Sequence, residues 1–249
     1  MLGEFVLPTG GTAWTASFID VLARLEVEEK ATRQAIMRTA SAGWLRSSRE
    51  GRRTRWALTP AGSRLLTEGA ERIYGFASAD TDWDGRWLVV LARVPETDRQ
   101  ARHLLRTRMS WAGLGAVAPG TWISPQPDRQ AEVEGVLAEA GVTDAHCFVA
   151  THSLGDQRRM VADAWDVDAI AADYAGFVDR FTGAAPRDVM TRQVDLVHRW
   201  RRFPQIAPTL PRQLLPDRWP GDAAGEVFRS RHAEWLEPAL AAWKELDAS

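Results

Sequence analysis

Residues 30–55 hold most of the side chains in this chain that could bind an anionic polymer. They include Lys30 and seven arginines but one acid, Glu50, so the segment carries a formal charge of +7 and the rest of the chain −9. Guanidinium groups bind phosphate oxygens with two parallel hydrogen bonds. A basic block beside an acidic body is typical of a module that contacts nucleic-acid phosphates, although a solvated basic face would have the same composition.

Side chains that could catalyse a reaction are few. The pairs His146-Cys147 and His152-Ser153 are adjacent in sequence, and adjacent residues on a strand point to opposite faces, so neither pair forms a nucleophile and its base. The chain has no G-x-S-x-G, P-loop or H-E-x-x-H motif. A single cysteine excludes an internal disulfide and a cysteine-rich zinc site. We therefore expect no enzyme, no metal and no cofactor, with Cys147 packed as a small apolar residue.

The elements that would position the basic block follow from apolar spacing and turn residues. Helices are predicted at 14–25 and 29–42, the second ended by Gly43. Residues 44–58 are predicted to form two strands joined at Glu50-Gly51, and Thr59-Pro60 to begin a helix that reaches about Tyr74. Helix, helix, basic hairpin and helix is the order of a winged helix-turn-helix domain.

The second helix is predicted to have two different faces. At about 100° per residue, its small and apolar residues Thr32, Ala35, Ile36 and Thr39 lie together and would pack on the domain. The opposite face is basic and polar and would fit a major groove. The predicted DNA-binding residues are Lys30, Arg33, Gln34, Met37, Arg38 and Ser41 on the helix, and Arg49, Arg52, Arg53 and Arg55 on the hairpin.

The rest of the chain is predicted to complete an α+β protein of three domains. A winged helix-turn-helix at 1–76 and a polar link at 77–82 precede a ferredoxin-like β-α-β-β-α-β domain at 83–152, which would serve dimerisation or act as a hinge. Its strands are expected at 87–92, 116–118, 121–124 and 145–150, and its helices at 97–114 and 128–140. Residues 153–249 are predicted to form a helical domain, with helices at about 160–181, 186–202 and 223–246 and a loop at 203–221.

Composition indicates a soluble cytoplasmic protein. Hydrophobic residues make up 45% and charged residues 26% of the chain, and the longest apolar runs are too short to span a bilayer. The first residues, MLGEFVLPTGG, have no basic stretch before an apolar core, so no signal peptide is expected.

Two groups of residues in the last hundred positions could bind an effector. Of the 12 tryptophans, Trp165, Trp200 and Trp219 could line an aromatic pocket, although packing in the core is the interpretation we favour for each. The arginines Arg199, Arg201 and Arg202 could meet phosphates, but a solvated helix end is again favoured.

Six segments resemble the PaaX-like family of repressors, the regulators of bacterial phenylacetate degradation. They are GEFVLPTGGTAW, ATRQAIMRTASAGWL, REGRRTRWALTPAG, DWDGRWLVVLARVPE, GLGAVAPGTWISP and VHRWRRFPQIAPTLPRQLLPDRWPG. The resemblance covers nearly the whole chain. It implies a homodimer that binds palindromic double-stranded operator DNA and is released by a small-molecule effector, an acyl-CoA thioester such as phenylacetyl-CoA. Arg33 and Arg38 match arginines of the family's recognition helix, and Arg49, Arg52 and Arg53 match its basic wing.

The chain departs from that family's pattern, and other interpretations stay open. The family usually has a longer helix before GEFVLP, and Thr39 stands where a leucine is usual, which predicts weaker docking of the second helix. The middle domain also resembles a CRISPR-associated endoribonuclease fold whose metal-binding aspartate is replaced here by Arg93, and a guanidinium cannot ligate magnesium. A dimeric metabolite-binding or adaptor protein whose winged helix contacts protein is the alternative. The helix at 60–74 is expected to connect effector and DNA sites.

Overall fold

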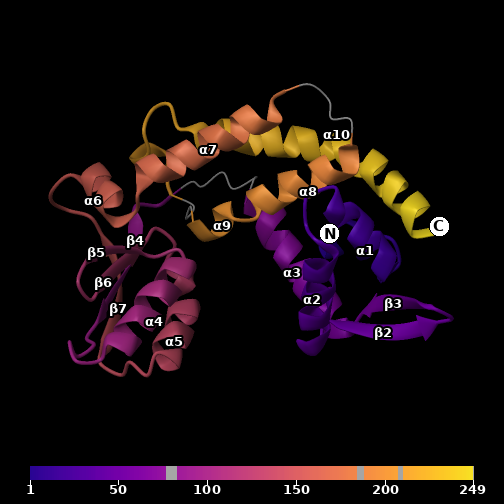
Figure 1. Cartoon of the computed structure of the whole chain (residues 1–249). Coiled ribbons are helices and arrows are strands. Elements are labelled where there is room, and N and C mark those ends of the chain that lie inside the picture. The colour runs from indigo at the N-terminus through magenta and orange to yellow at the C-terminus, as the bar shows by residue number, and fades with distance from the viewer. Residues whose placement is uncertain (77–82, 184–187, 207–209, 249) are drawn as a thin grey trace. The chain divides into compact units, whose positions relative to one another are not determined.

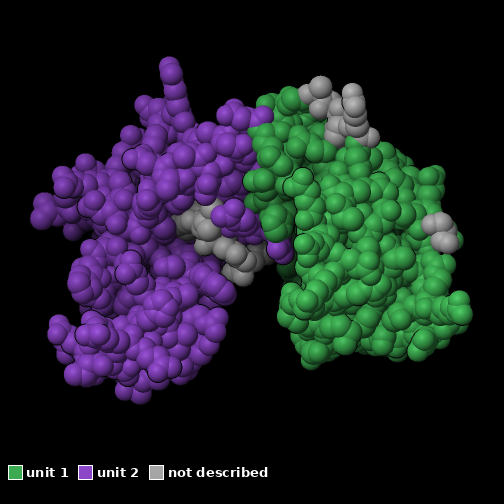
Figure 2. Space-filling view, viewed as in Figure 1, with its two compact units in different colours: residues 1–77, 180–200, 225–249 green, residues 78–179, 201–224 purple. Residues whose placement is uncertain are grey.

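The computed structural model describes residues 1–76, 83–183, 188–206 and 210–248, and shows an α+β protein with two small antiparallel sheets (Figure 1). Contacts group the chain into two compact units (Figure 2). The first contains residues 1–77, 180–200 and 225–249, and the second contains residues 78–179 and 201–224. Among the described residues, no helix has the length and apolar character needed to cross a membrane.

The first unit begins with the elements that carry the basic block. In chain order they are η1 (Leu2–Val6), β1 (Thr12–Trp14), α1 (Thr15–Ala23), α2 (Glu29–Ser41), β2 (Leu45–Glu50), β3 (Arg53–Leu58) and α3 (Pro60–Phe76). The predicted order of two helices, a hairpin and a third helix is confirmed. Gly51 has a φ of 63° at the hairpin tip, a backbone conformation that glycine adopts without strain. Thr59 begins α3 by accepting a hydrogen bond from the backbone N–H of Gly62 at 3.1 Å.

Strand β1 was not predicted. It pairs antiparallel with β3, placing Trp14 opposite Arg55, and makes a sheet in the order β1-β3-β2. Three residues are too few to show the alternation that identifies a strand in a sequence.

Two helices from the end of the chain complete the first unit. They are α8 (Val189–Trp200) and all but the first turn of α10 (Pro220–Ala248). Met190 of α8 and Trp243 of α10 are buried in the same core as Phe5, Phe18 and Ile36. The apolar face of α2 therefore packs in a core that combines both ends of the sequence. The predicted start of α8 lies outside the described residues, and α10 is longer than predicted at both ends.

The second unit contains a four-stranded antiparallel sheet. Its elements are β4 (Arg86–Ala92), α4 (Arg99–Trp111), β5 (Gly115–Ala118), β6 (Thr121–Ser124), η2 (Pro127–Arg129), α5 (Gln130–Glu139) and β7 (Ala145–Thr151), in the predicted β-α-β-β-α-β order of strands and α-helices. The strand order is β5-β6-β4-β7, and α4 and α5 lie side by side on one face (Figure 1). Leu88 and Val90 of β4 and Leu105 and Met109 of α4 are buried between these layers.

The prediction of one helix over 160–181 was wrong. The structure has α6 (Gln157–Ala164) and α7 (Val167–Phe181), because Trp165 between them is extended, with φ −130° and ψ 140°. The Asp166 carboxylate then accepts the backbone N–H of Ala169 at 3.0 Å and begins α7.

The segment predicted as a loop at 203–221 contains two short helices, α9 (Phe203–Ile206) and η3 (Arg212–Leu214). The predicted link at 77–82 lies outside the described residues. The domain limits stay a prediction, because residues of 153–249 belong to both contact units.

Candidate nucleic-acid interface

Helix α2 presents the two faces that its sequence predicted. Thr32 and Ile36 are buried, and Ala35 and Thr39 are half-buried. The Thr39 hydroxyl donates a 2.8 Å hydrogen bond to the carbonyl of Ala35, so this polar side chain is satisfied within its own helix. The side chains that are exposed on the other face are Lys30, Arg33, Gln34, Met37, Arg38 and Ser41. We call these six residues the basic face; their role in DNA binding stays a prediction.

The β2–β3 hairpin places further arginines at the surface. Arg49, Arg52 and Arg53 are exposed, whereas Arg55 is half-buried and donates to the hydroxyl of Thr12 at 2.9 Å. Arg46 on β2 is also exposed, although it was not among the predicted DNA-binding residues. Within the described part of the chain, Arg46, Arg49 and Arg52 have no ion-pair partner. Their charge is therefore available to an outside anion.

Trp14 is a residue of this surface that the sequence did not indicate. The guanidinium carbon of Arg53 lies 4.3 Å from the centre of a Trp14 ring, and that of Arg55 lies 5.0 Å away. Arg53 and Arg55 are two positions apart on β3 and therefore share a face of the strand. In the sequence, the i, i+2 spacing of these arginines indicates that they share a face. It does not indicate Trp14, because β1 was not predicted as the strand that pairs with β3. The Trp14 indole thus supports two arginines through cation–π contacts.

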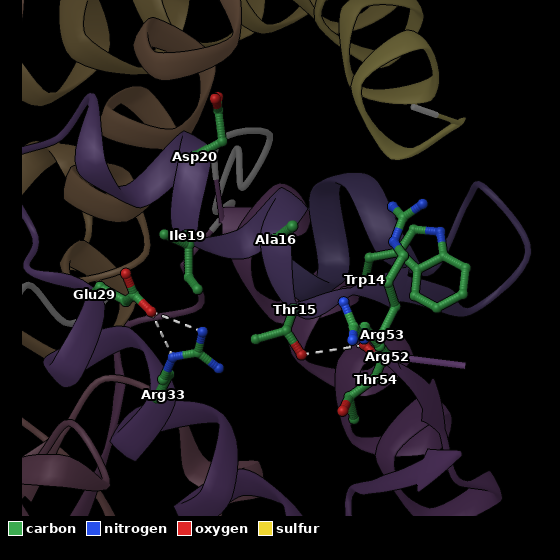
Figure 3. Close-up of a pocket in the computed structure, with 10 residues that line it drawn as sticks. All are labelled: Trp14, Thr15, Ala16, Ile19, Asp20, Glu29, Arg33, Arg52, Arg53 and Thr54. Carbon is green, nitrogen blue, oxygen red and sulfur yellow. Dashed lines mark hydrogen bonds and ion pairs between the residues drawn. The ribbon is translucent and has the colours of Figure 1, made fainter. Parts of the chain in front are cut away.

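A cleft of about 440 Å³ separates α1, the start of α2 and the hairpin (Figure 3). Glu29 and Arg33 line one side, with the Arg33 guanidinium 2.7 Å from the carboxylate, and Trp14 and Arg53 line the other. An exposed i, i+4 ion pair is worth about 0.2–0.5 kcal/mol. Exchanging Glu29 for a phosphate as the partner of Arg33 therefore costs little. The full lining is Trp14, Thr15, Ala16, Ile19, Asp20, Glu29, Arg33, Arg52, Arg53 and Thr54.

Thr15 fixes α1 to the hairpin across this cleft. Its hydroxyl donates to the carbonyl of Thr54 at 3.1 Å and accepts the indole N–H of Trp56 at 2.9 Å. These contacts join the helix that precedes α2 to the strand that carries Arg53. The cleft walls are therefore connected by hydrogen bonds as well as by packing.

A buried carboxylate connects η1 to the helices of the first unit. Glu4 accepts hydrogen bonds from the Tyr74 hydroxyl and from the amide of Gln193, the latter at 2.7 Å, and the Nε2 atom of His232 lies 3.3 Å from it. Burial acts to raise the pKa of Glu4, but its contacts with His232, Tyr74 and Gln193 outweigh burial and lower it. Burial and the Glu4 charge raise the pKa of Tyr74, so its hydroxyl remains a donor.

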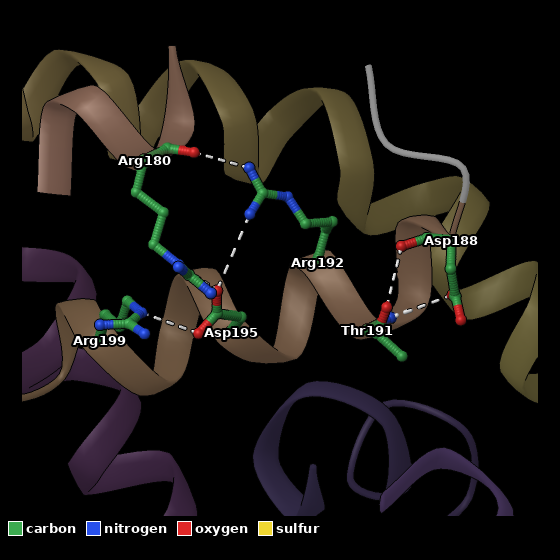
Figure 4. A network of polar contacts seen from close by, with 6 residues as sticks. All are labelled: Arg180, Asp188, Thr191, Arg192, Asp195 and Arg199. Carbon is green, nitrogen blue, oxygen red and sulfur yellow. Dashed lines mark hydrogen bonds and ion pairs between the residues drawn. The ribbon is translucent and has the colours of Figure 1, made fainter. Parts of the chain in front are cut away.

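The arginines around α8 have structural partners (Figure 4). Asp195 accepts from Arg180 at 2.6 Å and from Arg199 at 2.9 Å. Arg192 donates to the carbonyl of Arg180 at 2.7 Å, and Arg231 to that of Phe181 at 3.0 Å, and both carbonyls belong to the last turn of α7. Basic side chains commonly satisfy carbonyls at a helix C-terminus. This cluster therefore closes the end of α7, and Arg201 and Arg202 are exposed beyond α8.

The tryptophans considered for an aromatic pocket pack against other rings. Trp200 is buried, stacks on Phe228 with ring centres 4.5 Å apart, and donates to the carbonyl of Ile73 at 3.0 Å. Trp165 stacks on Trp87, and Trp219 meets Tyr174 edge to face. These contacts agree with the packing interpretation.

The positions considered for nuclease or thiol chemistry have other partners. Arg93 is exposed, with its guanidinium 3.8 Å from Asp144, and in the described ranges no group of three or more His, Cys, Asp or Glu could hold a metal ion. Cys147 is half-buried against the core of the second unit, and burial raises the pKa of its thiol. It lies opposite Val90, and His146 opposite Leu91, as alternation on a strand requires.

Comparison with known proteins gives consistent matches along the chain. Residues 1–62 match the model described as PaaX-like protein, residues 80–162 the PaaX protein central Cas2-like domain, and residues 165–245 the PaaX-like protein C-terminal domain. The transcriptional repressor PaaX of Escherichia coli (strain K12) is 31% identical over 257 residues, which cover 97% of this chain and 80% of that protein. The solved structure of uncharacterized protein Rv0674 from Mycobacterium tuberculosis shares the fold, with a TM-score of 0.65 at 20% identity, covering 98% of this chain and 96% of that one.

Proposed function

The chain belongs to the PaaX-like protein family, and from this premise we propose that it is a transcriptional repressor that binds double-stranded operator DNA. The observation that carries the proposal is the exposed basic face of α2 beside the exposed arginines of the β2–β3 hairpin. In this proposal residues 1–76 form a winged helix-turn-helix in which α1 and α2 are the helix pair, α2 is the recognition helix and the hairpin is the wing.

The chemistry of the basic face suits the major groove. Arg33 and Arg38 offer paired donors to guanine, and Gln34 offers a donor and an acceptor to adenine. Met37 is 56% exposed in the middle of this face, where its apolar side chain would meet thymine methyl groups. The wing arginines would contact phosphates or the adjacent minor groove.

Replacing Arg38 or Arg33 with alanine is expected to weaken operator binding by about 1–3 kcal/mol, because each would lose a base contact. The ion pair with Glu29 does not prevent Arg33 from contacting DNA, because breaking that pair costs at most about 0.5 kcal/mol. Gel-shift titrations on the operator and on base-substituted operators measure the loss. R106A is the control, because Arg106 is exposed on α4 of the second unit. Full operator affinity in both R33A and R38A would show that α2 does not lie in the major groove.

Replacing Arg52 or Arg53 with alanine is expected to weaken binding to every DNA sequence alike. Each lost phosphate contact should reduce the slope of log K against log salt by about 0.9, which is roughly eightfold in affinity at 0.1 M salt. Titrations at several salt concentrations, with operator and unrelated DNA, measure both quantities. An unchanged slope would show that these arginines do not touch phosphates.

The repressor is proposed to act as a homodimer through the β-α-β-β-α-β part of the second unit, which we assign to the ferredoxin-like class. Support comes from β7, an edge strand without a charged residue, on which Phe148 and Val149 are 51% and 49% exposed. Natural edge strands usually carry charges or are covered. Two recognition helices on a dimer would enter major grooves about 34–36 Å apart, which requires a palindromic operator.

Release is proposed to follow binding of a small effector, an acyl-CoA thioester such as phenylacetyl-CoA, which resemblance to the family supports. A ligand releases DNA only by binding one arrangement of the protein better than the other. Phenylacetyl-CoA should therefore dissociate the operator complex at concentrations where coenzyme A alone does not. Equal effects of the two compounds would show that the protein does not recognise the aryl-acyl group.

Protection of the DNA upstream of its own gene tests the function as a whole. We expect two protected half-sites related by a twofold axis, with protection that persists against excess unrelated DNA. No protection at any salt concentration, together with capture of a protein through the basic face, would favour the adaptor alternative.

A further inference from the structure

Trp14 is held from two sides by residues distant in sequence. Its indole supports Arg53 and Arg55, as described above. Its backbone N–H donates to the Asp247 carboxylate at 2.9 Å, and the Ser17 hydroxyl donates to the same carboxylate oxygen at 2.5 Å. Trp14 is the N-cap residue of α1 and its own side chain makes no capping hydrogen bond. The last turn of α10 thus provides the acceptor for the backbone N–H at the start of the first helix of the helix pair.

The register of α10 on this region is fixed by one large side chain. Trp243 is buried and stacks on Phe5 with ring centres 5.5 Å apart. Its ring centre lies 5.9 Å from that of Phe18 on α1. Asp247 is one turn further along the same face of α10, because residues four apart lie above one another on a helix. A buried tryptophan therefore aims the carboxylate at Trp14.

Resting on the proposed DNA-binding function, we propose that Asp247 and Trp14 position the wing arginine Arg53 for DNA, so that the C-terminal end of α10 controls the affinity of the hairpin. Asp247 fixes the backbone of Trp14, Trp14 fixes the guanidinium of Arg53, and Arg53 meets phosphate. Neither Asp247 nor Trp14 needs to touch DNA. Both are positioning residues that act through Arg53.

Salt-dependent operator binding by D247A tests the proposal. The slope of log K against log salt is expected to fall by about 0.9, the value for one phosphate contact, as in R53A. The matched control is D98A, because the Asp98 side chain caps α4 of the second unit by accepting from Ala101 at 2.9 Å. D98A should lose a similar amount of thermal stability and keep the wild-type slope. D247N keeps an oxygen acceptor and is expected to recover most of the slope.

A double-variant cycle separates positioning from general destabilisation. W14L keeps an apolar side chain but removes the cation–π contact, and W111L is its control, because exposed Trp111 makes a similar contact with Arg108. If Trp14 acts through Arg53, the W14L/R53A variant binds operator no more weakly than R53A alone. Wild-type slopes in D247A and W14L, or additive losses in the double variant, would overturn the proposal. Failure of the wild-type protein to bind DNA would instead overturn the proposed function.

Discussion

Replacing Trp243 with alanine is expected to lower the free energy of unfolding of the first unit by about 3–5 kcal/mol. Trp243 is 1% exposed and its indole fills the space between Phe5 and Phe18. Alanine would leave a cavity at the point where α10, η1 and α1 meet, and it would remove the indole N–H that donates to the Thr9 hydroxyl at 3.3 Å. Loss of this packing also frees the end of α10 that carries Asp247.

Calorimetric or chemical unfolding measures this effect. The control is W111A, because Trp111 is 63% exposed and its truncation should cost no more than about 0.5 kcal/mol. We expect W243A to melt well below both the wild type and W111A, and to lose operator binding at temperatures where W111A still binds. A W243A variant as stable as W111A would show that α10 does not contribute to this core.

The face of α2 could be predicted from sequence because it depends on local information. The 3.6-residue period separates Thr32 and Ile36 from Arg33 and Arg38, and burial follows that separation. The hairpin was predictable for a similar reason, since Gly51 marks the turn. Both signals lie within a few residues of the elements that they describe.

The residues that the sequence did not reveal depend on contacts between distant segments. Trp14 acquires its role by pairing with Arg55 and by bonding to Asp247, which lies 233 positions away. No periodicity in one segment reports such a pair. The break at Trp165 has the same origin, because the apolar spacing of 160–181 continues through it while the Trp165 ring packs against Trp87. Packing in three dimensions overrides the local helical pattern at this position.

Replacing Glu4 with leucine is expected to destabilise the first unit by about 3–5 kcal/mol, the range for removing one partner of a buried charged network. Leucine would leave the Tyr74 hydroxyl and the Gln193 amide without their acceptor, in a site where Gln193 is fully buried. Urea unfolding of E4L against the wild type measures the loss. E68L is a suitable control, because Glu68 is exposed on α3. Equal stability of the two variants would contradict the role of Glu4.

The pH dependence of stability gives a second, independent measurement on Glu4. Its pKa in the folded protein is lower than its ordinary value of 4.5, so the ionised carboxylate stabilises the folded protein more than the protonated carboxyl does. The resulting stability is complete above the ordinary pKa and is lost as the pH falls below it toward the folded pKa. E4Q keeps the size of the side chain but cannot titrate, so it should lack this part of the acid-induced loss. Parallel stability curves for E4Q and the wild type between about pH 5 and 3 would show that Glu4 is not the titrating group.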